Sequence, residues 1–213
     1  MSAGTLFDYW RSSASYRVRI ALGLKGLTAD QAVVNLRNGE QRDPAHLLRN
    51  PSGLVPVWKE GEFVLSQSLA IIEYLDETHP VPPLLPGDPG ARAQIREIAL
   101  MIAADIHPIA NLRVLDKLTA DHGSDAAARA SWVCHWVGLG LAAVESRLRT
   151  TAGRFAVGDK PTLADCCLVP QLYNARRFEV DIAAFPTIAR VEAACLALPA
   201  FRAAVPESQR DAA

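Results

Sequence analysis

The first eighty residues change repeatedly between the hydrophobic spacing of strands and that of helices. Apolar stretches predict strands at residues 5–10, 32–36, 54–59 and 63–65. Helical spacing predicts helices that begin near residues 12–15, at 43 and at 69, and end near residues 25, 49 and 77. A helical crossover joins parallel strands and a tight hairpin joins antiparallel ones, so this β-α-β-α-β-β-α order predicts a mixed four-stranded sheet with helices on its faces.

Two details of these helices can be predicted from single residues. The first helix has Val18, Ala21 and Leu22 at helical spacing on one apolar face, and it should stop at Gly26. The third is expected to be capped by the hydroxyl of residue Ser66 or Ser68.

Residues 78–90 break this pattern with five prolines and two glycines, which cannot continue a helix. Beyond them the spacing is helical, at residues 95–118 with an expected kink at His107–Pro108, then at 125–148, 163–178 and 187–198. We therefore predict an α/β domain at residues 1–80, a Pro-rich linker at 81–90 and an all-helical domain at 91–213. The tail from Pro206 is expected to fray.

Two features of the helical domain are specific enough to test. Thr162 and Asp165 have the spacing of a capping box that opens the helix at residues 163–178. Inward-facing positions of the helix at residues 125–148 are expected to be Trp132, Trp136, Leu139 and Val144.

The composition and the spacing of residues argue against several classes of function. The chain has 213 residues and a formal charge of −1 without a basic block, which argues against a nucleic-acid partner. No apolar run approaches the length that spans a bilayer, and the N-terminus lacks a signal-peptide pattern, so we expect a cytoplasmic protein without a membrane partner. The four cysteines lie in apolar helical stretches as small hydrophobes, and the five histidines lack metal-ligand spacing, so no metal is expected.

The stretch with the clearest chemical character is the hydroxyl-rich turn before the first helix. Ser12, Ser13 and Ser15 lie at the helix start, where unpaired N–H groups and the helix dipole favour an anion. The alternative is that Ser12 or Ser13 is simply an N-cap.

These features together resemble a cytosolic glutathione transferase. The residues RSSASYRVRIAL at positions 11–22 resemble the serine-rich signature of the zeta class, which contains the maleylacetoacetate and maleylpyruvate isomerases. Further matches to that class are found at residues 50–51, 55–56, 67–75, 105–109, 111–115, 162–165 and 174–178. The resemblance covers nearly the whole chain and implies a thioredoxin-like first domain, glutathione as cofactor and a homodimer.

Two positions depart from the class. Many members have cysteine where this chain has Ala14, so a mixed disulfide with glutathione cannot form there. Ser52 replaces a glutamine that contacts glutathione in some relatives, and that contact is therefore in doubt here.

The resemblance implies a role for each of a small set of residues. The implied principal hydroxyl for the thiolate is Ser12, with Ser13 as the other candidate and Arg11 beside the thiol. Ser15 is either a further donor or a helix-start residue without a ligand role. The other implied glutathione contacts are Gln41, Val55 through the backbone of a cis Val55–Pro56 turn, Gln67, Ser68 and His107. For His107 the alternative is an ordinary helix residue before a kink proline. The cations for the substrate carboxylates are Arg11, Arg113 and Arg177.

The implied reaction is the glutathione-dependent cis–trans isomerisation of maleylacetoacetate, a dicarboxylic keto acid of aromatic amino-acid catabolism, to fumarylacetoacetate. Thiolate adds to the activated double bond, rotation follows and thiolate leaves. The alternatives are a maleylpyruvate isomerase of gentisate catabolism, a general glutathione-conjugating transferase, and a binding protein of the same fold without catalysis.

Overall fold

The computed structural model describes residues 2–212. The chain divides into two compact units. Unit 1 combines Met1–Leu85 with Leu196–Ala213, and unit 2 is Pro86–Cys195. The C-terminal segment thus packs with the α/β part of the chain, although its sequence continues the helical part.

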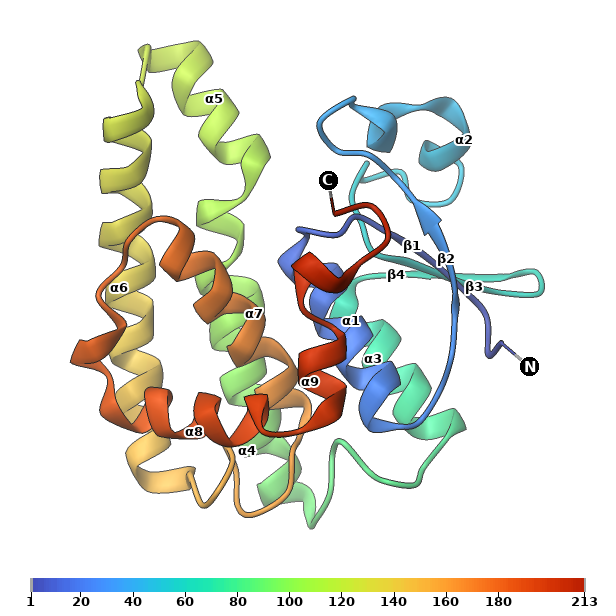
Figure 1. The fold of residues 1–213 in the computed structure, drawn as a ribbon, viewed down its shortest axis with the longest axis vertical. Coiled ribbons are helices and arrows are strands. Elements are labelled where there is room, and N and C mark those ends of the chain that lie inside the picture. The colour runs from blue at the N-terminus through green and yellow to red at the C-terminus, as the bar shows by residue number, and fades with distance from the viewer. Residues whose placement is uncertain (1, 213) are drawn as a thin grey trace. The chain divides into compact units, whose positions relative to one another are not determined.

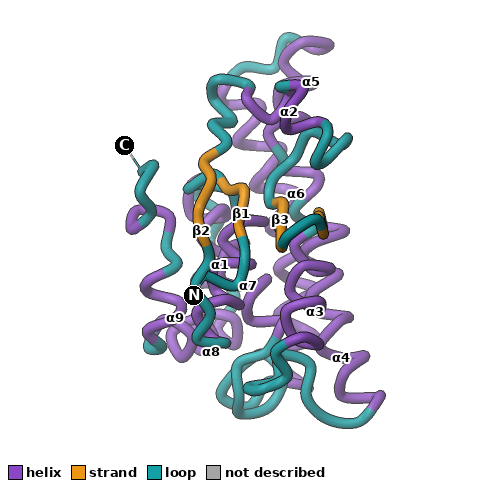
Figure 2. The backbone as a smooth tube through the Cα atoms, turned by 90° about the vertical axis from the view of Figure 1, so that its right-hand side faces the viewer, coloured by secondary structure: helices purple, strands orange, loops and turns teal. Residues whose placement is uncertain are grey.

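Unit 1 is built on a mixed four-stranded sheet in the order β2-β1-β3-β4, as the sequence predicts (Figures 1 and 2). The strands are β1 Thr5–Asp8, β2 Asp30–Val33, β3 Val57–Glu60 and β4 Phe63–Ser66. β1 pairs in parallel with β2 and antiparallel with β3, which pairs antiparallel with β4. β2 begins two residues before the predicted start, and β3 begins after Pro56, whose nitrogen carries no hydrogen for the ladder.

The helices of unit 1 are α1 Ser13–Leu24, α2 Pro44–Leu47, α3 Ser68–Thr78 and α9 Pro199–Ala203, with short 3₁₀ turns at Glu40–Arg42 and Pro206–Ser208. α1 contacts both α3 and α9, and Figure 1 shows it between them. Every residue of α1 from Ser15 to Leu22 is buried. The apolar face expected at Val18, Ala21 and Leu22 is buried as predicted, and neighbouring elements cover the rest of this stretch as well.

The two faces of the sheet are covered by different parts of unit 1. Side chains alternate along a strand, so Leu6 and Asp8 point one way and Phe7 the other. Asp8 reaches Arg19 of α1, whereas the guanidinium of Arg49, just after α2, lies 4.3 Å from the ring centroid of Phe7. The first face therefore carries α1, and the second carries the segment that follows α2.

The tail is attached to unit 1, so the expectation that it frays from Pro206 was wrong. Pro206 is buried, and the side chain of Gln209 is hydrogen-bonded to Gln31 of β2. The backbone N–H of Trp10 donates to a carboxylate oxygen of Asp211. These contacts join residues 178 and 201 positions apart in sequence, which local patterns do not reveal.

Unit 2 is helical. Its elements are α4 Pro89–Leu100, a π-helix Met101–Ile106, a 3₁₀ turn Pro108–Ala110, α5 Leu112–His122, α6 Ala126–Thr151, α7 Leu163–Arg177, a 3₁₀ turn Ile182–Ala184 and α8 Pro186–Leu196. The expected kink at His107–Pro108 is confirmed, because the α-helical pattern ends in the π-helix just before it. α4 starts at Pro89, inside the segment predicted as linker, since proline suits the first turn of a helix.

The buried face of α6 was predicted only in part. Val144 is buried as expected, and Trp132 and Trp136 are half-buried, but 60% of Leu139 is exposed. The buried residues of this helix are Val133, Val137, Leu141, Val144, Glu145 and Leu148. They follow helical spacing on one face, and Leu139 lies outside it.

The capping box at the start of α7 is confirmed. A carboxylate oxygen of Asp165 accepts the backbone N–H of Thr162 at 2.8 Å and its hydroxyl at 2.9 Å, and the other accepts the N–H of Ala156 at 2.8 Å. Asp165 is fully buried, and burial raises its pKa although these hydrogen bonds oppose the rise. Unit 2 thus encloses an acid whose polar atoms are occupied by protein donors.

The helical run Pro89–His122 contains a stretch long and apolar enough to cross a membrane by length and composition, with mean hydropathy 1.5. This differs from the expectation that no such run exists, because the apolar stripe continues through the kink. The run is not one regular helix, since a π-helix and a 3₁₀ turn interrupt it. Within the protein 28% of this stretch is buried, and Ile95, Ile98 and Ile102 of the same run are among the buried residues.

Candidate functional site

The serine-rich turn forms the N-terminus of α1. Ser12 is the N-cap, with extended backbone, and its hydroxyl oxygen accepts the N–H of Ser15 at 3.2 Å. Its own N–H donates to the carbonyl of Tyr9 at 2.9 Å, which fixes the turn. Ser12 is therefore an N-cap, as the alternative interpretation predicted. The hydrogen of the Ser12 hydroxyl is still available to a ligand, because a hydroxyl group both donates and accepts.

Other donors at this turn are not used by the protein. Within residues 2–212, the N–H groups of Ser13 and Ala14 have no acceptor, as expected for the first turn of a helix. Ser15 is fully buried, and its hydroxyl has no hydrogen-bond partner in the described part of the chain. Unpaired donors at the positive end of a twelve-residue helix make this turn suited to an anion.

Arg11 and Val55 lie beside the same turn. The guanidinium of Arg11 lies 5.2 Å from the ring centroid of Trp10. Val55 is buried in a small apolar cluster with Tyr9, against which Trp10 packs. The Val55–Pro56 bond is cis, as the resemblance implies, and the N–H and C=O of Val55 have no partner within the described residues. The arrangement leaves the backbone N–H and C=O of Val55 open next to the turn.

The start of α3 presents a second set of free N–H groups. Its N-cap is Gln67, in left-handed backbone at φ 74°, so the prediction that Ser66 or Ser68 caps this helix was wrong. Gln67 is exposed, whereas Ser68 is buried and its hydroxyl accepts a hydrogen bond from Nη1 of Arg17 at 3.2 Å. A buried cation beneath a helix N-terminus gives this position a strong preference for an anion.

Gln41 lies on the 3₁₀ turn Glu40–Arg42. Its Oε1 is buried and has no hydrogen-bond partner among the described residues. The backbone carbonyl of Gln41 faces Gly53, at φ 61°, where a Cβ would lie 3.2 Å from that oxygen. Ser52 next to it is exposed, and its N–H donates to Asn50. The unsatisfied amide oxygen of Gln41 can accept one further donor.

Three predicted site residues belong to unit 2, each on a different element. His107 is half-buried at the end of the π-helix, where its N–H donates to Ile102. Arg113 is exposed in the first turn of α5. Arg177 is exposed at the end of α7, with its guanidinium 5.7 Å from the ring centroid of Phe178. Within unit 1, Arg17 of α1 contacts Ser68 at the start of α3, Val55 packs with Tyr9 just before the serine turn, and Gln41 lies beside Gly53.

Sequence reasoning missed Arg17 and Arg19, which are 2% and 6% exposed on α1. Arg17 holds Ser68, and Arg19 forms an ion pair with Asp8 at 2.8 Å and donates to the carbonyl of Trp10 at 2.8 Å. The available signal was the alternation of arginine with valine and isoleucine at residues 17–20, because cations inside an apolar helix require partners.

The cysteines of the chain do not form a reactive site. Cys166, Cys167 and Cys195 are buried thiols that form no disulfide, and the partly buried Cys134 donates to the carbonyl of Phe178. Burial, with a smaller effect from neighbouring Asp165, raises the pKa of the Cys195 thiol far above its usual range. A thiolate at this site must therefore come from outside the chain.

Both the sequence and the structure of the chain are similar to those of known proteins. Family models described as "Glutathione S-transferase, N-terminal domain" and "Glutathione S-transferase, C-terminal domain" match residues 2–77 and 137–199. A probable maleylacetoacetate isomerase of Vibrio cholerae is 50% identical over 209 residues, which cover 97% of each chain.

Two solved structures show the same likeness. The holo structure of a maleylpyruvate isomerase, described as a bacterial zeta-class glutathione S-transferase, has a TM-score of 0.96 at 45% identity, covering 98% of this chain and all of that one. A maleylacetoacetate isomerase of Anaeromyxobacter dehalogenans with glutathione bound in its active site has a TM-score of 0.89 at 46% identity, covering 98% and 97%. The chain therefore belongs to the zeta class of the glutathione transferases, the family of the maleylacetoacetate and maleylpyruvate isomerases.

Proposed function

We infer that this protein is a glutathione-dependent cis–trans isomerase that converts maleylacetoacetate to fumarylacetoacetate. The observation that carries this inference is the N-terminus of α1, where the Ser12 hydroxyl adjoins two unused N–H groups in a glutathione transferase fold. Relatives named maleylacetoacetate isomerase occur in bacteria and in the rat at 42–50% identity.

The free polar groups of unit 1 fit the three parts of glutathione. The N–H groups at the start of α3, with Ser68, Gln67 and buried Arg17, suit the γ-glutamyl carboxylate. The open peptide group of Val55 suits the cysteinyl backbone, which it would bind as an added strand. The buried Oε1 of Gln41 is the group proposed for the glycyl end, and His107 of unit 2 is a further proposed contact.

The serine turn is proposed to hold the sulfur as an anion. Ordinary thiols have a pKa of about 8.5, so few are ionised at neutral pH. Donors from Ser12, Ser13 and Ser15 and the positive end of α1 stabilise the charged form and so lower that pKa. When bound, glutathione supplies a nucleophile that adds reversibly to the activated double bond, so that rotation about the resulting single bond becomes possible.

Arginines are proposed to hold the two carboxylates of the substrate. A guanidinium group grips a carboxylate through two parallel hydrogen bonds and stays charged at all relevant pH values. Arg11 adjoins the serine turn, and Arg113 and Arg177 are exposed at helix ends of unit 2. Their role is to orient the diacid and to stabilise negative charge that develops on its keto group.

The decisive experiment measures isomerisation by the purified protein with and without glutathione. We expect glutathione-dependent conversion of maleylacetoacetate, with a fall of about 10²-fold or more in kcat/KM for the double variant Ser12→Ala/Ser13→Ala. Ser131→Ala, an exposed position on α6, is the matched control and should behave as the parent protein does. Absence of glutathione-dependent conversion would reject the function, and unchanged turnover in the double variant would reject the role of the serines.

Maleylpyruvate is the second candidate substrate, favoured by the TM-score of 0.96 to a maleylpyruvate isomerase. The two keto diacids need the same residues and differ in length. Comparing kcat/KM on both acids separates them, and we expect the higher value for maleylacetoacetate. A chromogenic aryl halide tests for general conjugation, and no turnover of any of the three would favour a non-catalytic binding protein. We also propose a homodimer in the cytoplasm, which sedimentation and cell fractionation test.

A further inference from the structure

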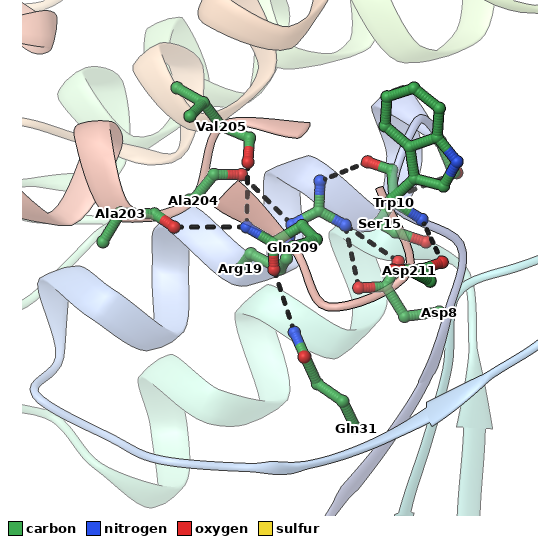
Figure 3. Close-up of polar contacts among 11 residues, drawn as sticks. Asp8, Trp10, Ser15, Arg19, Gln31, Ala203, Ala204, Val205, Gln209 and Asp211 are labelled. Atoms are coloured by element: carbon green, nitrogen blue, oxygen red, sulfur yellow. Dashed lines mark hydrogen bonds and ion pairs between the residues drawn. The ribbon is translucent and has the colours of Figure 1, made fainter. Parts of the chain in front are cut away.

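The segment that follows α9 folds back onto unit 1, and we call residues 204–211 the C-terminal clasp. Nε2 of Gln209 donates to the carbonyls of Ala203 at 3.2 Å and Val205 at 2.9 Å, which closes the segment on itself. Oε1 of the same side chain accepts from Nε2 of Gln31 at 3.0 Å, which ties the clasp to β2 (Figure 3). These bonds place Asp211 beside the end of β1.

Asp211 contacts the backbone just before the serine turn. Its Oδ2 accepts the N–H of Trp10 at 2.9 Å, two residues before the cap Ser12. On the other side of the same residue, the carbonyl of Trp10 accepts from Nη2 of Arg19 at 2.8 Å. Figure 3 shows Trp10 held between the two charged side chains. Both peptide groups that flank Trp10 are thus fixed by charge-assisted hydrogen bonds, which are stronger than neutral ones.

Arg19 connects this contact to the rest of unit 1. Its Nη1 donates to both carboxylate oxygens of Asp8, at 2.9 and 2.8 Å, and its Nε donates to the carbonyl of Ala204 at 3.2 Å. The side chain is nearly fully buried, so water does not compete for these bonds. One guanidinium therefore joins the end of β1, the turn at Trp10 and the first residue of the clasp.

We propose that Asp211 and Arg19 are positioning residues for the isomerisation, acting through the backbone of Trp10 on the donors of the serine turn. The inference rests on the proposed function, in which those donors stabilise the thiolate. Donors lower a thiol pKa only if they stay aimed at the sulfur, and a displacement near 1 Å can cost about 10²-fold in rate. A distant segment of the chain thus sets the geometry at Ser12.

The test compares three variants of the full-length protein. Asp211→Ala removes the acceptor for the Trp10 N–H, Asp211→Asn keeps an acceptor oxygen without the charge, and Arg210→Ala alters an exposed neighbour as the matched control. Backbone hydrogen exchange without glutathione measures the mobility of residues 10–15. Ultraviolet absorbance of bound glutathione against pH measures the pKa of its thiol.

We expect Asp211→Ala to accelerate exchange at Trp10 by about tenfold or more, the factor expected from losing one hydrogen bond to a charged group. The thiol pKa of bound glutathione should rise, so the pH–rate profile shifts to higher pH and kcat at neutral pH falls by about tenfold. Asp211→Asn should keep most of the parent protein's slow exchange at Trp10 and most of its low thiol pKa. Arg210→Ala should match the parent protein.

Faster exchange confined to the clasp, with an unchanged thiol pKa and pH profile in Asp211→Ala, would overturn the inference. An equal loss of kcat in Asp211→Asn and Asp211→Ala, together with a lowered melting temperature, would also overturn the inference, because that pattern is expected of a purely structural role. If the parent protein itself shows no glutathione-dependent isomerisation, the proposed function fails instead. The two failures are therefore distinguishable.

Discussion

Two glycines of α6, two positions apart, should respond oppositely to the same substitution. At Gly140 an added Cβ would overlap Cγ1 and Cδ1 of Ile106, at the end of the π-helix. At Gly138 an added Cβ would meet no atom of residues 2–212 within 4 Å, apart from its chain neighbours and the backbone of its own helical turns. The structure therefore assigns Gly140 to a close approach between α6 and the π-helix, whereas Gly138 has no steric requirement.

The expected magnitudes follow from helix propensity and from packing. Alanine is favoured over glycine inside a helix by about 1 kcal/mol, so Gly138→Ala should raise the free energy of unfolding by about 0.5–1 kcal/mol. Gly140→Ala has the same gain, but overpacking a filled core costs about 1–3 kcal/mol. Ile106 is 3% exposed, which leaves it little room to move. We expect Gly140→Ala to be less stable than Gly138→Ala by about 1–3 kcal/mol.

Thermal and urea unfolding of the two variants beside the parent protein measure this difference. For a chain of this size, 1 kcal/mol shifts the melting temperature by about 2–4 °C, so the two variants should differ by roughly 2–12 °C. Gly140→Ala as stable as Gly138→Ala, or more stable, would refute the close approach of α6 to Ile106.

Two further predictions concern buried charges. Burial opposes ionisation of Glu145, but hydrogen bonds from the N–H groups of Ile188 and Thr187 and from Arg149 outweigh it and lower its pKa. Glu145→Gln should therefore cost about 1–3 kcal/mol of unfolding free energy at pH 7. The difference in unfolding free energy between the parent protein and Glu145→Gln should shrink as pH falls below about 4.3, through the lowered pKa of Glu145 in the folded state. Urea titrations in which this difference stays constant from pH 7 to pH 3 would contradict the prediction. Arg17→Lys should raise the KM for glutathione about tenfold with little change in kcat, because Arg17 holds Ser68 at the proposed carboxylate site. Steady-state kinetics measure both constants, and a loss confined to kcat would contradict this role.

Local sequence features predicted the elements and the chemistry of their ends. The order of strands and helices, the mixed sheet, the kink at His107–Pro108 and the capping box of Thr162 and Asp165 are confirmed. The helix ends, the kink and the capping box depend on residues a few positions apart, where spacing, proline and hydroxyl groups act directly on the backbone. The strand directions follow from the kind of connection, a helical crossover or a tight hairpin, that joins neighbouring strands. The serine turn was also visible in this way, since its donors come from one turn of one helix.

The sequence could not determine which surfaces the tertiary structure would cover. Leu139 is as apolar as the buried residues of α6 but lies on a face that the fold leaves exposed. Arg17 and Arg19 appear polar in sequence, yet neighbouring elements bury them and supply their partners. Asp211 reaches Trp10 across 201 positions of the chain. Burial and pairing at such separations depend on how whole elements pack. Tertiary structure alone therefore placed Arg19 and Asp211 beside the serine turn and Arg17 beside Ser68.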